Sequence, residues 1–72
     1  MDQIRSIGKL KAPYGGQEVE LQHVDYEGGG MPLLRIRIRE RSRFTIFDID
    51  ASMAEQWAAM MLDWARSQAP SE

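Results

Sequence analysis

The sequence predicts an α+β fold: a four-stranded antiparallel β-meander followed by one C-terminal α-helix packed on one face of the sheet (ββββα). Two clusters of glycine and proline, PYGG at 13–16 and EGGGMP at 27–32, separate segments rich in β-branched and aromatic residues. After position 50 the apolar residues recur with helical spacing. Because the chain has 72 residues, these elements fit one small domain over 1–72.

The four strands are expected at about 3–12, 17–27, 33–40 and 43–49. The second, third and fourth are rich in the β-branched and aromatic residues that favour a pleated, half-buried surface. The first alternates less regularly, because Ile4, Ile7 and Leu10 are three residues apart. Its assignment depends mainly on the turn cluster that follows it.

The helix is expected over about 52–68. Its interior contains no glycine and no β-branched residue, and it is dominated by Ala, Met, Leu, Glu, Gln and Arg, which favour helices. Asp50 or Ser52 can cap its N-terminus, and Ser52 with Glu55 has the spacing of a capping box. Pro70 marks its end.

Residues 35–43 read RIRIRERSR, with arginine at every second position. Such a stripe is either a phosphate-binding surface or one face of a strand whose charges are paired within the chain. Centring the second turn on Gly29 and Gly30, a pair suited to tight hairpin turns, favours pairing within the chain. It opposes Arg37 to Gln22, Arg39 to Glu20 and Arg41 to Glu18 on one face, and Ile36 to His23 and Ile38 to Leu21 on the other.

Centring the first turn on Tyr14 and Gly15 opposes Lys9 to Glu20, Lys11 to Glu18 and Leu10 to Val19. Both hairpins then place the charged residues on one face, in a basic, acidic, basic order across three strands. Directly opposed opposite charges contribute about 0.2–1 kcal/mol per pair and help to specify the register. We therefore expect a charge-paired outer face, with Arg35 and Arg43 free for a partner, although Asp48 or Asp25 could lie near Arg35.

A nucleic-acid-binding regulator is the alternative function, using the arginine-rich outer face. The fourth strand would place Phe44 and Ile46 beside Arg35, Arg37 and Arg43, and aromatic side chains among basic ones can stack on bases. However, interleaved carboxylates repel phosphates, and the net charge of −2 does not attract polyanions. The same exposed apolar pair more simply suggests contact with another protein chain.

The predicted helix carries more apolar surface than one sheet can cover. At 100° per residue, ten residues span roughly 200°, whereas a helix on a sheet needs an apolar stripe about half as wide. These residues are Met60, Met53, Trp64, Trp57, Met61, Ala54, Ala65, Ala58, Ala51 and Leu62. Part of the arc should cover the inward face of the sheet, formed by Leu10, Val19, Leu21, Leu34, Ile36, Ile38, Phe47 and Ile49.

The remainder of that arc favours a homodimer. Trp57 and Trp64 lie seven residues apart with Met60 and Met61 between them, so the stripe is either core or the seam of a two-fold dimer. The small size of the domain adds to this expectation, since a chain this short buries only about 60% of its unfolded surface. The candidate interaction surface therefore comprises Arg35, Arg43, Phe44, Ile46, Trp57, Met60 and Trp64.

Composition disfavours several other classes. The chain has no cysteine and one histidine, which excludes disulfides and thiolate metal sites. No apolar run has the length of a signal peptide or of a membrane span, so a cytoplasmic protein is expected, with no cofactor, no metal and no membrane association. Apolar residues at 43% and charged residues at 28% are typical of a folded domain.

No catalytic constellation is expected, and we predict that the protein is not an enzyme. His23 should be partly buried and hydrogen-bonded to a neighbour; Ser6 opposite it forms no hydrolase site without an orienting carboxylate and an oxyanion hole. Asp48 and Asp50 resemble a DxD motif, but a strand end and a helix cap explain them. The glycines at 28–30 lack the lysine and helix of a phosphate-binding loop.

The order APYGG, an acidic and apolar strand, LLRIRIRE, RFTIFDID and AEQWAAMMLDWA resembles a small bacterial family of uncharacterised single-domain proteins. The resemblance spans most of the chain and implies a short meander with a closing helix. It transfers no active residues. The expected function is therefore a non-enzymatic protein-interaction or structural module, acting as a homodimer that binds another protein.

Overall fold

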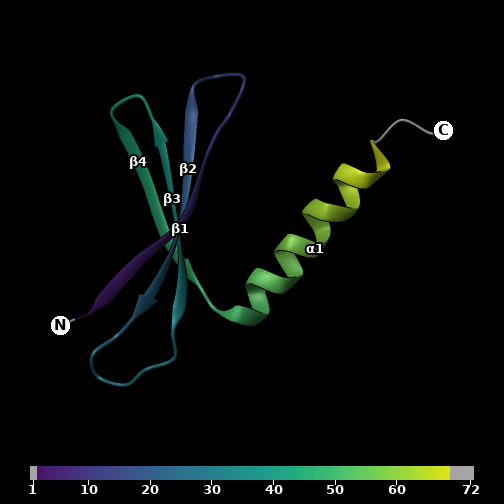
Figure 1. Cartoon of the computed structure of the whole chain (residues 1–72). Helices are drawn as coiled ribbons and strands as arrows, with labels where there is room; N and C mark the ends of the chain where they lie inside the picture. The colour runs from purple at the N-terminus through teal and green to yellow at the C-terminus, as the bar shows by residue number, and fades with distance from the viewer. Residues whose placement is uncertain (1, 69–72) are drawn as a thin grey trace.

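The structure, a computed structural model, describes residues 2–68 and has the predicted order of elements. Four strands, β1 (Gln3–Lys11), β2 (Gln17–Asp25), β3 (Leu33–Glu40) and β4 (Arg43–Ile49), form one antiparallel sheet in the order β1-β2-β3-β4 (Figure 1). The helix α1 (Ala51–Ser67) follows after a single residue. The ββββα fold class is confirmed.

Asp50 starts the helix by accepting a 2.8 Å hydrogen bond on Oδ1 from the backbone N–H of Met53. Of the two predicted caps, Asp50 is therefore the one used, and Ser52 lies within the first turn, where its Oγ accepts from Gln56. The helix ends at Gln68, whose N–H bonds to Ala65 at 3.2 Å. The predicted stop at Pro70 lies outside the described residues.

The first hairpin has the predicted register near its turn. Lys9 faces Glu20, Leu10 faces Val19 and Lys11 faces Glu18. A β-bulge between Ser6 and Gly8 then shifts the register by one residue, which opposes Ser6 to Gln22 and Arg5 to His23. The predicted pairing of Ser6 with His23 is therefore wrong, and the uneven spacing of Ile4, Ile7 and Leu10 reflects the bulge.

The second hairpin keeps the predicted faces but shifts the register by two residues. Glu18 faces Arg39, Glu20 faces Arg37, Gln22 faces Arg35 and His23 faces Leu34. The prediction assumed a two-residue turn at Gly29 and Gly30, whereas the segment between the strands runs from 26 to 32. Within it only Gly29 has a positive φ, of 81°, and its N–H bonds to the carbonyl of Tyr26.

The third hairpin turns over Arg41 and Ser42, and it opposes Glu40 to Arg43. Arg41 adopts φ 58°, a left-handed conformation that is unfavourable for a residue with a side chain. Arg41 therefore lies in the turn and does not face Glu18, as the sequence had suggested. The pairing of Arg37 with Ile46 and of Arg39 with Phe44 follows from this turn.

The core is small. Among the described residues only Val24, Ile36 and Ile49 are buried apolar side chains. Ile36 and Ile49 lie on the inner face, beneath the start of the helix, as predicted. Val24, at 1% exposure, lies on the outer face, where the register places it between Ile4 and Leu33, and it was not among the residues predicted to form the core.

The helix leaves the sheet at an angle, and its C-terminal half lies away from the strands (Figure 1). Its contacts with the sheet are mainly with β3, and no residue of the helix is buried. The radius of gyration is 14.7 Å, against about 11 Å for a compact domain of this length. Packing of the helix on the sheet is therefore limited to its N-terminal half.

Candidate interaction surfaces

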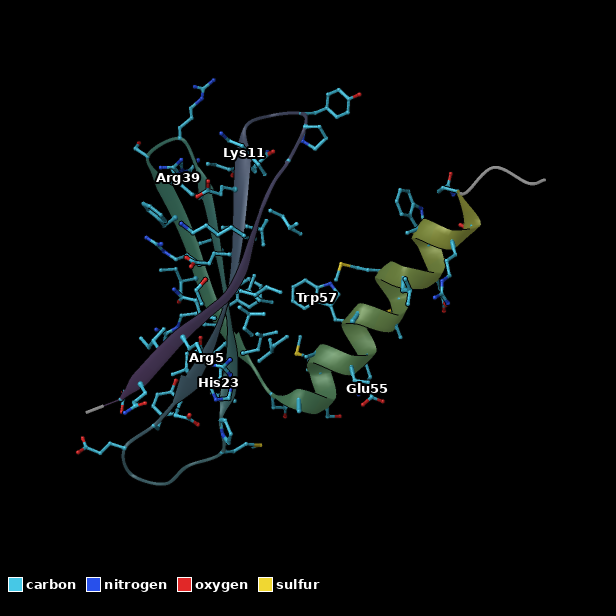
Figure 2. All side chains as sticks on the ribbon, in the orientation of Figure 1. Arg5, Lys11, His23, Arg39, Glu55 and Trp57 are labelled. Carbon is cyan, nitrogen blue, oxygen red and sulfur yellow. The ribbon has the colours of Figure 1, made fainter. Side chains whose placement is uncertain are left out.

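The apolar face of the helix is largely exposed. Trp57, Met60, Met61, Trp64 and Ala65 line a shallow groove on it, which we call the helix groove. Met60 is 66% exposed and Trp64 is 68% exposed. Trp57 is the exception, because it points toward the sheet (Figure 2) and stacks on Phe47 with ring centroids 5.8 Å apart. Beyond this stack, Met60, Met61 and Trp64 are each more than half exposed.

The inner face of the sheet is also only partly covered. Leu10 is 72% exposed, and Val19, Leu21 and Ile38 are half-buried. These residues lie on the face that the register assigns to Ile36 and Phe47. The helix diverges from the sheet toward its C-terminal end (Figure 1), and exposed apolar residues lie on both; we call this uncovered region between helix and sheet the wedge.

The area of exposed surface measures how incomplete this packing is. The chain exposes 6172 Å². A compact monomer of 8.3 kDa is expected to expose about 4,600 Å². The excess is about 1,600 Å², whereas a stable protein interface of standard size buries about 800 Å² on each partner. The uncovered surface is therefore large enough for a stable interface.

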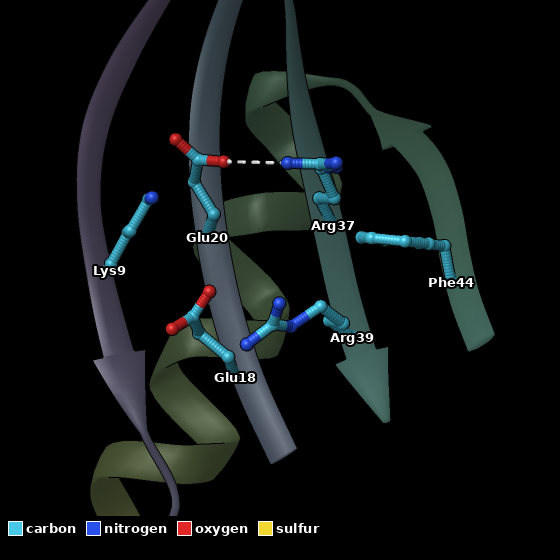
Figure 3. Close-up of a pocket in the computed structure, with 6 residues that line it drawn as sticks. All are labelled: Lys9, Glu18, Glu20, Arg37, Arg39 and Phe44. Atoms are coloured by element: carbon cyan, nitrogen blue, oxygen red, sulfur yellow. Dashed lines mark hydrogen bonds and ion pairs between the residues drawn. The ribbon is translucent and has the colours of Figure 1, made fainter. Parts of the chain in front are cut away.

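The outer face of the sheet is charge-paired around Glu20 (Figure 3). Glu20 is 8% exposed, and its carboxylate accepts a 2.8 Å hydrogen bond from Ser6 Oγ and lies 3.4 Å from Arg37 Nη1. The Ser6 hydroxyl, together with Lys9 and Arg37, lowers the pKa of Glu20 below 4.5 despite its burial. The guanidinium of Arg37 also lies over the Phe44 ring, 4.6 Å from its centroid.

Arg35 is held in a second network and is not free for a partner, which corrects the expectation from the sequence. Its Nε and Nη2 donate to the two oxygens of Asp48 at 2.9 and 3.2 Å. The hydroxyl of Tyr26 donates to Asp48 Oδ2 at 3.0 Å. The Arg35 guanidinium and then the Tyr26 hydroxyl lower the pKa of Asp48, although burial opposes them. The sequence offered Asp48 as a neighbour but gave no sign of Tyr26.

The predicted interaction residues divide between opposite sides of the sheet. Trp57, Met60 and Trp64 lie together on the helix, whereas Phe44 and Ile46 lie on the outer face, 49% and 53% exposed. One face of the Phe44 ring is covered by the guanidinium of Arg37. Arg43 lies at the start of β4, beside the third turn. The proposed single surface is therefore two surfaces, and Met61 belongs to the first.

One end of the sheet is basic. The turns of the first and third hairpins lie at the same end of the meander, and four cations gather there without an ion pair among the described residues: Lys11, Arg39, Arg41 and Arg43. Glu18 and Glu40 lie at the same end, and Glu40 accepts a hydrogen bond from Gln17. We call this the basic turn end. Sequence reasoning missed it because it paired Arg39 and Arg41 with carboxylates.

His23 lies beside Asp25 on the same strand. Its Nε2 lies 3.1 Å from Asp25 Oδ2, and its side chain is 33% exposed. Ser6 is bonded to Glu20 and not to His23. Within residues 2–68, no three His, Asp or Glu side chains are grouped closely enough to hold a metal ion.

A model described as a family of unknown function, DUF6967, matches residues 1–67. The chain belongs to this family. The membership agrees with the resemblance to a small family of uncharacterised single-domain proteins, and the family description assigns no activity that could transfer to these residues. Comparisons with curated proteins and with solved structures gave no match. Among the described residues, the single helix is too short and too polar to cross a membrane.

Proposed function

We propose that this protein is a non-enzymatic interaction module that works as a homodimer, assembled through the helix groove and the uncovered inner face of the sheet. The observation that carries the proposal is the apolar wedge between Phe47 and the exposed Trp64, which one chain leaves open. A cytoplasmic location, expected from the sequence, remains a prediction.

A second copy of the chain is the occupant that the surface chemistry favours. The chain exposes about 1,600 Å² more than a compact monomer of its mass, and its exposed apolar residues include Met60 and Trp64 on the helix and Leu10 on the inner face of the sheet. A two-fold dimer covers both kinds of surface with one interface, because each chain supplies what its partner lacks. Exposed methionines and tryptophans of this kind are enriched at the cores of protein interfaces.

Substitution of Trp64 by glutamate tests this proposal. Trp64→Glu should raise the dissociation constant of the dimer by about thirtyfold or more, since a central aromatic residue at an interface contributes at least about 2 kcal/mol. The matched control is Ala59→Glu, which adds the same charge on the opposite side of the helix. Sedimentation velocity at several concentrations gives both constants. Equal constants for the two variants would contradict the proposal.

A second candidate function is nucleic-acid binding, favoured by the four unpaired cations of the basic turn end. Tyr14, 86% exposed, lies in the first turn at the same end and could stack on a base. The outer face proposed from the sequence is less suitable, because Arg35 and Arg37 already pair with Asp48 and Glu20. Fluorescence anisotropy with a labelled oligothymidine at increasing salt tests it: affinity should fall steeply with salt and be lost in Arg39→Glu.

A further inference from the structure

The helix groove is built symmetrically along the chain. The large side chains that line the groove follow the order Trp57, Met60, Met61, Trp64, so that both tryptophans lie three and a half residues from the point between the methionines. At 100° per residue all four side chains fall within about 100° of the helix surface. The groove therefore has nearly the same chemistry in either direction along the helix axis.

A two-fold interface requires a surface that is complementary to itself. We propose that a second copy of the chain docks its helix antiparallel in the helix groove, with the two-fold axis between Met60 and Met61. This inference rests on the proposed homodimer and adds its geometry. It places Trp57 of one chain against Trp64 of the other, and it packs the methionines of both chains at the centre.

Two observations favour the antiparallel direction over a parallel one. Trp57 is already stacked on Phe47, so an antiparallel partner adds its Trp64 to this pair and completes an aromatic cluster at each end of the interface. The sheet adjoins only the N-terminal half of the helix, as Figure 1 shows. An antiparallel pair separates the two sheets, whereas a parallel pair would crowd both at one end.

The direction of the backbone dipoles agrees with this arrangement. The amide end of each helix, capped by Asp50, would lie near the carbonyl end of its partner, where the helix dipoles attract each other. The uncovered part of the inner face, including Leu10, flanks the same wedge and would lie beside the partner's helix. A single two-fold interface thus covers both the helix groove and the inner face of the sheet.

Cysteine cross-linking of the full chain tests the geometry, because the protein contains no cysteine of its own. Met53, Met60 and Ser67 are spaced seven residues apart on one line of the helix. In the antiparallel pair, position 60 lies beside its own copy, whereas positions 53 and 67 lie about 20 Å from theirs. A disulfide requires Cα atoms within about 7 Å.

Mild oxidation followed by non-reducing electrophoresis should therefore cross-link Met60→Cys and leave Met53→Cys and Ser67→Cys uncross-linked. Met61→Cys, on the other side of the axis, should also cross-link, which guards against a folding defect in one variant. Ala59→Cys, on the opposite side of the helix, is the control and should remain uncross-linked.

The experiment distinguishes a dimer with another geometry from the absence of a dimer. Cross-linking at all three positions of the line would indicate a parallel pair and overturn the proposed geometry. No cross-linking at 60 or 61, with a dimeric mass for the unsubstituted chain, would place the groove against the partner's sheet and overturn the geometry alone. A monomeric mass for the unsubstituted chain would overturn both the geometry and the homodimer.

Discussion

The indole ring of Trp57 lies on the ring of Phe47, with centroids 5.8 Å apart and planes 18° from parallel. This stack joins the helix to the inner face of the sheet about two turns after the Asp50 cap. Trp64, one heptad further along the chain, is 68% exposed. The boundary between the folded core and the uncovered surface therefore lies between these two tryptophans.

The stack should contribute measurably to stability. Phe47→Leu keeps most of the apolar volume but removes the ring, so the free energy of unfolding should fall by about 0.5–1.5 kcal/mol, the contribution of an aromatic pair beyond its buried area. Tryptophan fluorescence should change as well. Phe44→Leu is the control, because Phe44 lies on the outer face and should leave the fluorescence unchanged. Urea unfolding at one fixed protein concentration measures both variants.

The register of the second hairpin can be measured by double-mutant cycles. Glu20 and Arg37 face each other with their charged groups 3.4 Å apart, so replacing both by alanine should give a coupling of about 0.2–1 kcal/mol. A cycle between Glu20 and Arg39 should give a coupling near zero. The reverse pattern would support the register predicted from the turn at Gly29 and Gly30.

Stability should depend on the protonation of Glu20 in mild acid. Its pKa in the folded chain is below 4.5, the ordinary value, because Ser6, Lys9 and Arg37 favour the carboxylate. The unfolded chain therefore binds more protons below pH 4.5, and stability is lost as the pH falls through the folded pKa. Glu20→Gln should flatten the dependence of unfolding free energy on pH between about 5 and 3.

Two comparisons complete this pH experiment. Ser6→Ala removes the hydrogen bond that lowers the pKa most, so it should flatten the dependence partly. Some dependence should persist in both variants, because Asp48 also has a lowered pKa. If the unfolding free energy of Glu20→Gln depends on pH as that of the unchanged chain does, the pKa of Glu20 is not lowered by Ser6, Lys9 and Arg37.

The third turn carries a conformational strain that glycine should relieve. Arg41 has φ 58°, a conformation that costs a residue with a side chain about 1–2 kcal/mol. Part of this gain is offset by the greater entropy of glycine in the unfolded chain, so Arg41→Gly should stabilise the protein by about 0.5–1 kcal/mol. Ser42→Gly, at a position without a positive φ, should destabilise it. Thermal unfolding of both variants checks the sign.

The sequence predicted the elements and the faces of the sheet because both depend on local periodicity. The period of two in the strands placed Glu18, Glu20 and Arg37 on one face whatever the register. The predicted helix contains no glycine or proline that would interrupt it. A shift of two residues in the second hairpin changes every partner without moving any side chain to the other face. The faces were therefore predictable, but the pairs were not.

The errors arose at turns and at a bulge. The glycines at 28–30 do not specify the length of their loop, and Arg41 lies in a left-handed conformation that its side chain does not favour. The length of the second loop decides whether Arg39 faces Glu20 or Glu18, and the third turn removes Arg41 from the strand. The bulge at Ile7 moved Ser6 away from His23, and the Tyr26 hydroxyl bond to Asp48 depends on a loop conformation that no sequence pattern encodes.

The apolar excess of the helix was predictable from its 200° arc, but its extent required the structure. Only the structure shows that Trp57 is engaged while Met60, Met61 and Trp64 remain exposed. The predicted interaction surface joined Trp57, Met60 and Trp64 with Phe44 and Ile46, although the period of the strands already placed Phe44 and Ile46 on the outer face and the helix on the inward face. The position of the helix relative to the sheet therefore determines which residues form the helix groove.

Association of the unsubstituted chain tests the central claim most directly. Sedimentation equilibrium, from low to high micromolar concentration, determines its mass in solution while tryptophan fluorescence follows the exposure of Trp64. The account predicts twice the mass of one chain at high concentration, with an emission shift toward shorter wavelength as the dimer forms. The mass of a single chain at every concentration, with no change in emission, would contradict it.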